Sequence, residues 1–434
     1  MSLLEHPKAE RLLAEAEVTA DSVRSCRERL TRFIERYLPL FGRKEQHQHA
    51  LVVVQGRLSN LERKTSEPIA YLASQERKPV QNFVGAGAWD DEVIMSELRR
   101  HVGQEVGDAD AVLVLDPSAF AKKGTESCGV DRQWCGRLGK VDNCQVGVFW
   151  GYASVRGRAL VDRRLYLPKE WAQDRKRRKK CHVPPEVVFQ EKWRIGLERL
   201  TRIGPDLPHG WIAADDEFGR VAEFRAALRQ RRERYVVDIP SNTLMRVVGE
   251  RTVDGRKAPF VRVDAWAAQQ PAARWQKLRV RAGTKGELVV RALTVLVQTK
   301  EEGGRVGAAE QLVVIRNVAG QPQTWYALSN ARHEPLLTLV AVKGARHTIE
   351  ELLQDGKGEV GLGQYEVRSW VGWHHHMTLA MLALWFLELE KRRLGKKNTG
   401  DHADTDPGDL RPAAPAARAG SDADCPRGHA GAAA

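Results

Sequence analysis

The sequence predicts an α/β protein in which a helical N-terminal region precedes a mixed sheet. Before residue 105, apolar side chains recur at helical spacing. After it come short apolar, β-branched runs such as VLVLD at 112–116 and WIAAD at 211–215. Helical patterns separate these runs as far as RYVVDIP at 234–240. Strands that alternate with helices are typical of the α/β class.

Composition bounds the size of the protein and the class of its partner. A chain of 434 residues predicts two or three folded units, and 42% hydrophobic residues can supply their cores. The formal net charge of +13 favours a polyanionic partner such as nucleic acid, although many basic proteins bind none. No apolar stretch approaches ~18 residues, so we expect no membrane span and a cytoplasmic protein.

Residues 1–105 are predicted to form a helical domain. Between Val23 and Leu38, apolar residues at helical spacing are interleaved with five arginines. A second helix is expected over 51–62. The basic residues either form a solvated face or contact DNA. We favour a DNA-binding domain, because signals of a nuclease occur elsewhere in the chain.

The order of the following elements predicts an RNase H-like core. Strands are expected at 109–116, 143–155, 158–167, 210–215 and 234–240, with helices at 185–202 and 220–232. This β-β-β-α-β-α-β order places the first and fourth strands side by side. We assign the core to 106–241 and 330–394, and a β-rich insertion of alternating strands to 242–329. Residues 395–434, rich in Gly, Ala, Pro and Asp, are predicted to be a disordered tail.

Three acidic residues are candidates for a metal site. Asp116 and Asp215 each follow an apolar run, which predicts that they lie at the carboxyl ends of strands, where α/β proteins collect active-site residues. A turn or cap role is the alternative for Asp116, and Asp216 or Glu217 could replace Asp215. Glu350 lies in a helical pattern. Carboxylates from two strand ends and a helix predict a site for paired divalent cations.

Two basic residues share a predicted helix face with Glu350. Arg346, Glu350 and Lys357 stand at offsets of 0, 4 and 11, which places them within about 40° of one another around a helix. Glu350 can coordinate a cation while Arg346 and Lys357 bind phosphates. An ordinary solvated ion pair is the alternative. Glu351, Glu359 and Glu366 are other carboxylates, but none has both basic partners on its face.

These residues, with several longer blocks, resemble DDE-type transposases of bacterial insertion sequences. One large group carries a Tyr-x2-Arg-x3-Glu-x6-Lys signature, which Arg346, Glu350 and Lys357 match, whereas Lys343 stands at the Tyr position. The blocks include DPSAFAKKGTESCGVDRQWCGRLGKVDNCQVGVFW, VPPEVVFQEKW, ADDEFGR and KGEVGLGQYEVRSWVGWHHHMTLAMLALWFL. They occur in the family's order, and the resemblance as a whole covers roughly residues 20–395.

The resemblance implies an activity, a cofactor and a partner. Asp116, Asp215 and Glu350 would hold two Mg²⁺ ions, for which Mn²⁺ could substitute. The reactions implied are cleavage at transposon ends and strand transfer into target double-stranded DNA, by at least a homodimer. An RNase H-like nuclease without strand transfer, or a catalytically inactive or domesticated DNA-binding relative, is the alternative.

Further basic residues are candidate phosphate contacts, although a solvated loop is the alternative for them. They are Lys122 and Lys123 and, in the basic run at 175–180, Arg175, Arg177 and Arg178. His374, His375 and His376 could suggest a metal site, but the matching family block favours a structural or DNA-adjacent role. The cysteines form no CxxC pair, so reduced thiols are expected, with a metal site at Cys128, Cys135 and Cys144 as the alternative.

Overall fold

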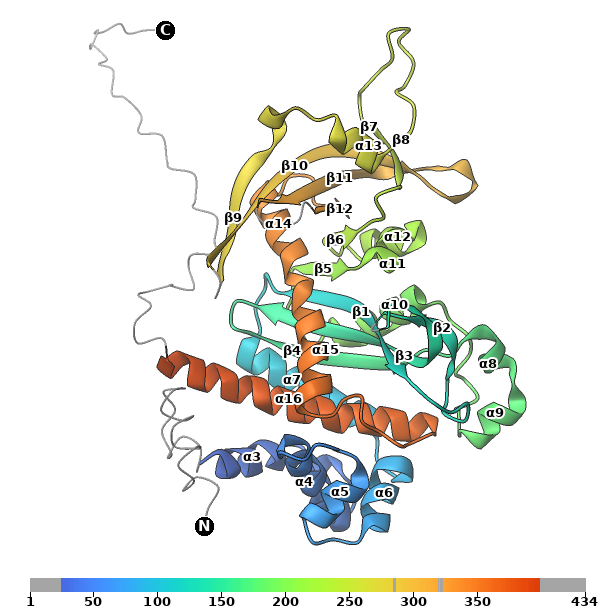
Figure 1. Cartoon of the computed structure of the whole chain (residues 1–434), viewed down its shortest axis with the longest axis vertical. Helices are drawn as coiled ribbons and strands as arrows, with labels where there is room; N and C mark the ends of the chain where they lie inside the picture. Colours follow the sequence, from blue (N-terminus) through green and yellow to red (C-terminus); the bar gives the residue numbers. More distant parts are fainter. Residues whose placement is uncertain (1–24, 137, 284–285, 319, 321–322, 399–434) are drawn as a thin grey trace, which may run out of the picture.

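The computed structural model describes residues 25–398, except for 137, 284–285, 319 and 321–322 (Figure 1). Its N-terminal region is helical, as predicted, and its α-helices bury apolar residues; in the first, Leu30, Phe33 and Ile34 lie inside. The second long helix runs over 44–58 rather than 51–62. The elements are α3 (Cys26–Glu35), η2 (Leu38–Leu40), α4 (Lys44–Leu58), α5 (Ser66–Leu72), α6 (Arg77–Ala86) and α7 (Asp91–Val106).

The five central strands have the RNase H-like order β4-β3-β1-β5-β6. β3 pairs antiparallel with β1 and β4, whereas β1, β5 and β6 run parallel to one another. The first and fourth core strands are therefore adjacent, as predicted. The strands are β1 (Val112–Ala121), β3 (Lys140–Ser154), β4 (Gly157–Leu165), β5 (Trp211–Ala214) and β6 (Tyr235–Asp238), with a further hairpin strand, β2 (Asp131–Cys135), beside β3.

Two core elements differ from their predicted bounds. β1 does not end at Asp116 but continues to Ala121, because β3 pairs with it along its whole length. Pro117 is tolerated there because β5 has already ended on the other side, where no partner needs its missing N–H. The helix expected from 185 begins at Lys192 as α10 (Lys192–Ile203). The carbonyls of Pro184 and Val187 accept hydrogen bonds from Arg178, which holds 184–191 as a loop.

The β-rich segment extends the central sheet instead of forming a separate layer. β12 pairs antiparallel with β6, and β11, β10, β7 and β8 follow in order, so one sheet of 12 strands results (Figure 1). The elements of this segment are β7 (Leu244–Val247), β8 (Val261–Arg262), α13 (Val263–Ala268), η3 (Ala272–Arg274), β9 (Gln276–Gly283), β10 (Gly286–Lys300), η4 (Glu302–Gly304), β11 (Val306–Asn317) and β12 (Thr324–Ser329).

Helices cover both faces of the core strands. Trp150 donates from its indole to the Gly196 carbonyl on α10, whereas the next residue of β3, Gly151, packs against Ile349. Because successive strand residues point to opposite faces, α10 and the helix that carries Ile349 lie on opposite sides of the sheet. The remaining helices are α8 (Lys169–Gln173), α9 (Arg175–Lys180), α11 (Asp216–Gly219), α12 (Ala222–Gln230), α14 (Leu336–Ala345), α15 (His347–Glu359) and α16 (Trp370–Asn398).

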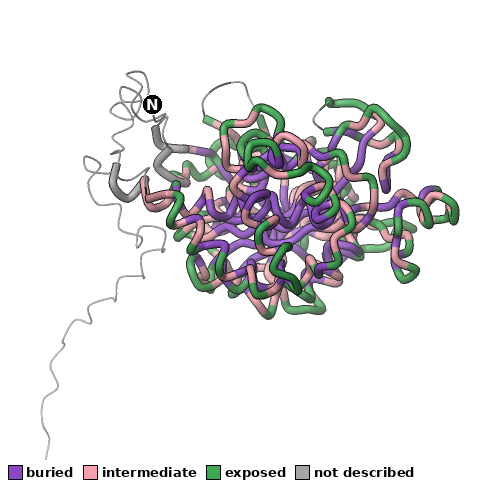
Figure 2. The backbone as a smooth tube through the Cα atoms, turned by 90° about the horizontal axis from the view of Figure 1, so that it is seen from below, coloured by how far each residue is buried: buried purple, intermediate pink, exposed green. Residues whose placement is uncertain are grey.

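The last helix ties the N-terminal region to the core. α16 has 29 residues and lies between the N-terminal helices and the sheet (Figure 1). Buried residues run through the middle of the molecule, and exposed ones gather on peripheral loops (Figure 2). α16 continues to Asn398, so the first four residues of the predicted tail, 395–398, are helical; the rest of that prediction, 399–434, lies outside the described residues. No helix in the described part has the length and apolarity needed to cross a membrane.

Candidate active site

Three aspartates lie side by side where the parallel strands end. Leu115 on β1 is in register with Ala214 on β5, which is in register with Val237 on β6. The next residue on each strand is Asp116, Asp215 and Asp238 respectively. Asp116 and Asp215 are therefore neighbours, as the strand patterns predicted, although Asp116 lies within β1 and not at its end. Asp238 was not among the predicted site residues.

Local geometry fixes the second and third aspartates. The Oδ1 atom of Asp215 accepts hydrogen bonds from the backbone N–H groups of Glu217 and Phe218, which caps α11. α11 also lies very close to β6: a Cβ atom added at Gly219 would be 1.9 Å from the Asp238 carbonyl oxygen. Only glycine permits this approach, which holds the capped Asp215 beside the end of β6.

Glu350 reaches the same place from the first turn of α15. Arg346, at the junction of α14 and α15, lies between the acids. Its Nη2 is 2.6 Å from Glu350 Oε1, its Nε is 3.2 Å from Asp238 Oδ2, and its Nη1 is 3.7 Å from Asp116 Oδ1. Two of the three predicted acids, Asp116 and Glu350, thus contact one guanidinium, whereas Asp215 is only near enough for this charge to lower its pKa. The Arg346–Glu350 ion pair, which was the alternative to a metal role, is formed.

The acids of this cluster are poorly compensated. Burial, followed by the charge of Asp215, raises the pKa of Asp116 well above its usual range. Burial and then Glu217 raise the pKa of Asp215 to about 7, and burial also raises the pKa of Asp238. Burial alone would lower the pKa of Arg346, but Asp238, Glu350 and Asp116 raise it. An added cation would relieve the repulsion among these carboxylates.

The donor set fits a hard divalent cation, although its oxygen atoms are not yet gathered around one point. Carboxylate oxygens are the ligands that Mg²⁺ and Mn²⁺ prefer. Within the described ranges, no three His, Cys, Asp or Glu side chains are grouped closely enough to hold a metal ion. The reason is visible in the contacts: Glu350 turns toward Arg346 and His347. Arg346 contacts Asp116, Asp238 and Glu350 and so already supplies a positive charge among the acids.

Comparison with known proteins identifies the family. A family model described as "DDE superfamily endonuclease" matches residues 36–288, more than half of the chain. The chain belongs to the DDE superfamily endonucleases. This confirms the family predicted from the sequence motifs and agrees with the RNase H-like strand order. Asp116, Asp215 and Asp238 lie inside the matched range, whereas Arg346 and Glu350 follow it.

A named relative gives a narrower likeness. The probable transposase for insertion sequence element IS701 from Microchaete diplosiphon is 26% identical over 197 residues. The aligned region is 44% of this chain and 49% of that protein. The chain therefore matches about half the length of this curated relative.

The lysines that were predicted to contact phosphates near these acids, Lys357, Lys122 and Lys123, differ in their surroundings. The Lys357 Nζ atom donates a hydrogen bond to Ser118 Oγ at 2.9 Å. Ser118 follows Asp116 by two residues on β1, so the ammonium group of Lys357 lies next to β1 and not directly beside Glu350. Lys122 stands over the Tyr365 ring, 3.3 Å from its centroid, and burial lowers its pKa to about 8. Lys123 is exposed.

The predicted basic run forms the short helix α9, and its arginines are not equivalent. Arg177 donates to the carbonyls of Thr125 and Val130, and Arg178 donates to those of Pro184 and Val187. Both guanidiniums therefore brace loops. Arg175 is exposed and remains suited to a phosphate contact.

The consecutive histidines and the cysteines are built into the interior. His374, His375 and His376 are 5%, 0% and 2% exposed and hydrogen-bond to backbone carbonyls, as the structural interpretation predicts. Burial lowers the pKa of His374 to about 3, so it stays neutral at physiological pH. Cys128, Cys135 and Cys144 are buried free thiols.

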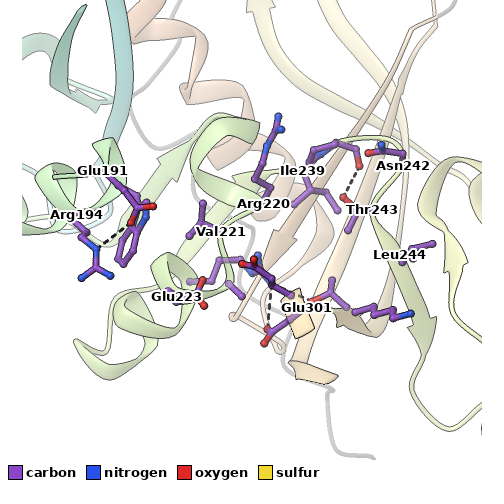
Figure 3. Close-up of a pocket in the computed structure, with 17 residues that line it drawn as sticks. Glu191, Arg194, Arg220, Val221, Glu223, Ile239, Asn242, Thr243, Leu244 and Glu301 are labelled. Atoms are coloured by element: carbon purple, nitrogen blue, oxygen red, sulfur yellow. Dashed lines mark hydrogen bonds and ion pairs between the residues drawn. The ribbon is translucent and has the colours of Figure 1, made fainter. Parts of the chain in front are cut away.

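A separate cavity lies between the core and the inserted strands (Figure 3). It has a volume of about 830 Å³, and its lining includes Arg194, Arg220, Glu223, Asn242 and Glu301. None of the three predicted acids lines it. Because four acidic and four basic side chains line it, its charge does not select an anion. We therefore assign the chemistry to the group formed by Asp116, Asp215, Asp238 and Glu350, here called the aspartate cluster, and not to this cavity.

Proposed function

We propose that this protein is a DNA transposase that cuts the ends of a mobile element and joins them to target DNA. The observation that carries the proposal is that Asp116 and Asp215 follow residues in register on adjacent strands, while Arg346 connects Asp116 to Glu350. Membership of the DDE superfamily endonucleases, the transposase name of the relative and the net charge of +13 support it. The substrate is DNA, so we place the protein's action in the cytoplasm.

In this proposal Asp116, Asp215 and Glu350 hold two Mg²⁺ ions, or Mn²⁺ in their place. The bound ions would activate the attacking oxygen and stabilise the leaving oxygen at a phosphodiester. Asp116 and Asp215 are fixed by strand pairing and by a helix cap, so they form the rigid side of the site. Glu350, on α15, forms the mobile side of the site, because its carboxylate must turn away from Arg346 before it can bind a metal ion.

The surrounding basic residues would hold the DNA backbone. Arg346 and Lys357 are close enough to the acids to bind phosphates next to the cleaved bond. Lys123 and Arg175 are exposed and would bind more distant phosphates. The N-terminal helices would bind the transposon end, and the joining of two ends would require at least a homodimer.

The test compares two neighbouring acids on α15. Glu350→Gln should abolish Mg²⁺-dependent cleavage of a labelled duplex that carries the terminal sequence of the element, while duplex binding is preserved. Glu351→Gln is the matched control, because Glu351 pairs with Arg158 and not with the aspartate cluster. It should cleave like the wild type. Equal activity of the two variants would refute the assignment of Glu350.

The same gel distinguishes the alternatives. Products in which a labelled end is joined to a second duplex support a transposase. Cleavage without joined products would make the protein an RNase H-like nuclease. Binding without either product, in the wild type and the variants alike, would make it an inactive DNA-binding relative.

A further inference from the structure

Asp238 is a fourth carboxylate at the site, and it differs from the other three in its partners. It ends β6, one strand away from Asp215, and its side chain is 15% exposed. Its Oδ2 atom contacts two cations, Lys343 Nζ at 3.3 Å and Arg346 Nε at 3.2 Å. The three proposed metal ligands have no lysine partner among the described ion pairs.

Arg346 connects Asp238 to two of the proposed ligands. A guanidinium has five N–H donors in a rigid plane, so it can bind several carboxylates at once. Here Nε faces Asp238, whereas Nη2 and Nη1 face Glu350 and Asp116. One nitrogen of the guanidinium, Nε, therefore contacts an acid outside the ligand set, and the other two contact the proposed ligands Glu350 and Asp116.

A divalent cation and this guanidinium compete for the same oxygens. A divalent cation carries twice the charge of the guanidinium, so at the same distance it attracts a carboxylate about twice as strongly. Arg346 must therefore give up Asp116 and Glu350 when a metal enters. It does not need to give up Asp238, because Asp238 contacts a different nitrogen atom, Nε.

Lys343 keeps the Asp238 carboxylate in place. It stands at the position where the related transposases carry tyrosine, and it lies on α14 one turn before Arg346. Its Nζ atom is 5.6 Å from the centroid of the Trp325 ring, which confines the ammonium between that ring and Asp238. Lys343 is thus the fixed cation that holds the Asp238 carboxylate in place, and this carboxylate also remains available to the movable cation, Arg346.

We propose that Asp238 is a positioning residue that retains Arg346 when the metal ligands release it. Asp238 thereby sets how easily a metal ion displaces the guanidinium. The inference rests on the proposed function, since it takes Asp116, Asp215 and Glu350 as the ligands. It predicts that Asp238 affects metal affinity only through Arg346.

The test is a double-mutant cycle on the full chain, with Mn²⁺ binding followed by electron paramagnetic resonance. Asp238→Asn should weaken Mn²⁺ binding on the order of three- to tenfold, since coupled neighbouring groups interact by such amounts. In an Arg346→Met background the same change should alter binding less than about twofold. An equal loss in both backgrounds would overturn the proposal, because Asp238 would then act directly, as a ligand or as a charge.

Two controls keep the result interpretable. Asp116→Asn should abolish Mn²⁺ binding; if it does not, the proposed metal site fails and not only the role of Asp238. If Asp238→Asn does not fold, Lys343→Met replaces it in the cycle. That variant keeps every acid, and its effect on Mn²⁺ affinity should be larger with Arg346 present than in the Arg346→Met background. Equal effects there would likewise overturn the proposal.

Discussion

Two clusters of buried charge in this protein differ in the balance of their charges. Beneath α7, arginines and acids from α7, β4, α10 and the loop after α10 occur in equal numbers, and four of them are buried whereas the others are partly exposed. Its members are Arg99, Arg163, Arg199, Arg202, Asp91, Glu92, Asp162 and Asp206. In the aspartate cluster, Arg346 contacts three acids, Asp116, Asp238 and Glu350, Lys343 contacts Asp238, and Asp215 is in ion-pair contact with neither cation.

The pKa values follow this difference. Burial alone would raise the pKa of Asp91 and Glu92, but Arg163 lowers both, and Arg199 adds to the effect on Glu92. In the aspartate cluster, burial raises the pKa of Asp116 and Asp215 and the cations do not reverse it. The balanced cluster therefore stabilises the fold. The unbalanced one is suited to receive cations, which is a mark of functional sites.

The largest effect is expected from breaking the balanced cluster. Arg163 is fully buried and contacts Asp91 and Glu92. Arg163→Met should lower the free energy of unfolding by about 3–5 kcal/mol, because it leaves buried carboxylates uncompensated. Urea denaturation of the purified variant measures this loss. An unchanged midpoint would show that the cluster does not stabilise the fold.

The unbalanced cluster should respond with the opposite sign. Asp215→Asn keeps a good helix cap but removes a repulsive charge, so without metal it should stabilise the protein. The pKa of Asp215 is raised to about 7, so the folded state holds this proton more tightly than the unfolded chain. Stability therefore falls as pH rises from about 4 to about 7.

The gain from Asp215→Asn should consequently be larger at pH 8 than at pH 5. It should be a few kcal/mol at most, on the order of 1.4 kcal/mol per unit of pKa shift. Thermal melting at the two pH values, in the presence of a chelator, measures it. A variant that is less stable than the wild type at pH 8 would contradict the description of this cluster as repulsive.

The smallest effects should separate phosphate contacts from bracing residues on α9. Arg175→Ala should reduce the slope of log affinity against log salt for DNA by about one, and leave stability unchanged. Arg178→Ala should instead destabilise the protein, because it frees the carbonyls of Pro184 and Val187, and should leave the slope unchanged. Fluorescence anisotropy across salt concentrations decides between them. Equal slopes for both variants would remove Arg175 from the DNA interface.

Much of this site could be predicted because its signals are local. An apolar run that ends in aspartate marks Asp116 and Asp215, and the i,i+4 spacing marks the Arg346–Glu350 pair. Asp238 ends the run YVVD in the same way, so the signal that found the first two aspartates was present but was not applied to it.

The parts that were missed depend on non-local pairing. β1 passes Asp116 only because β3 pairs with it to Ala121, and this extension brings Ser118 to Lys357. The inserted strands extend the core sheet only because β12 pairs with β6. Arg177 has the same composition signal as Arg175, but the carbonyls that bind it come from a loop about 50 residues earlier in the chain. Arg178 binds carbonyls of the loop that directly follows α9, which composition does not reveal either.

The most direct test of the central claim places sulfur at the cleaved phosphate. If the three acids hold metal ions that contact this phosphate, a phosphorothioate substrate should be cut poorly with Mg²⁺, because sulfur is a poor ligand for hard cations, and Mn²⁺ should restore cutting. The phosphorothioate should be cut more slowly than the unmodified substrate in Mg²⁺, and the two cleavage rates should become similar only in Mn²⁺. An identical ratio in Mg²⁺ and Mn²⁺ would contradict direct metal contact, and with it the account of Asp116, Asp215 and Glu350 given above.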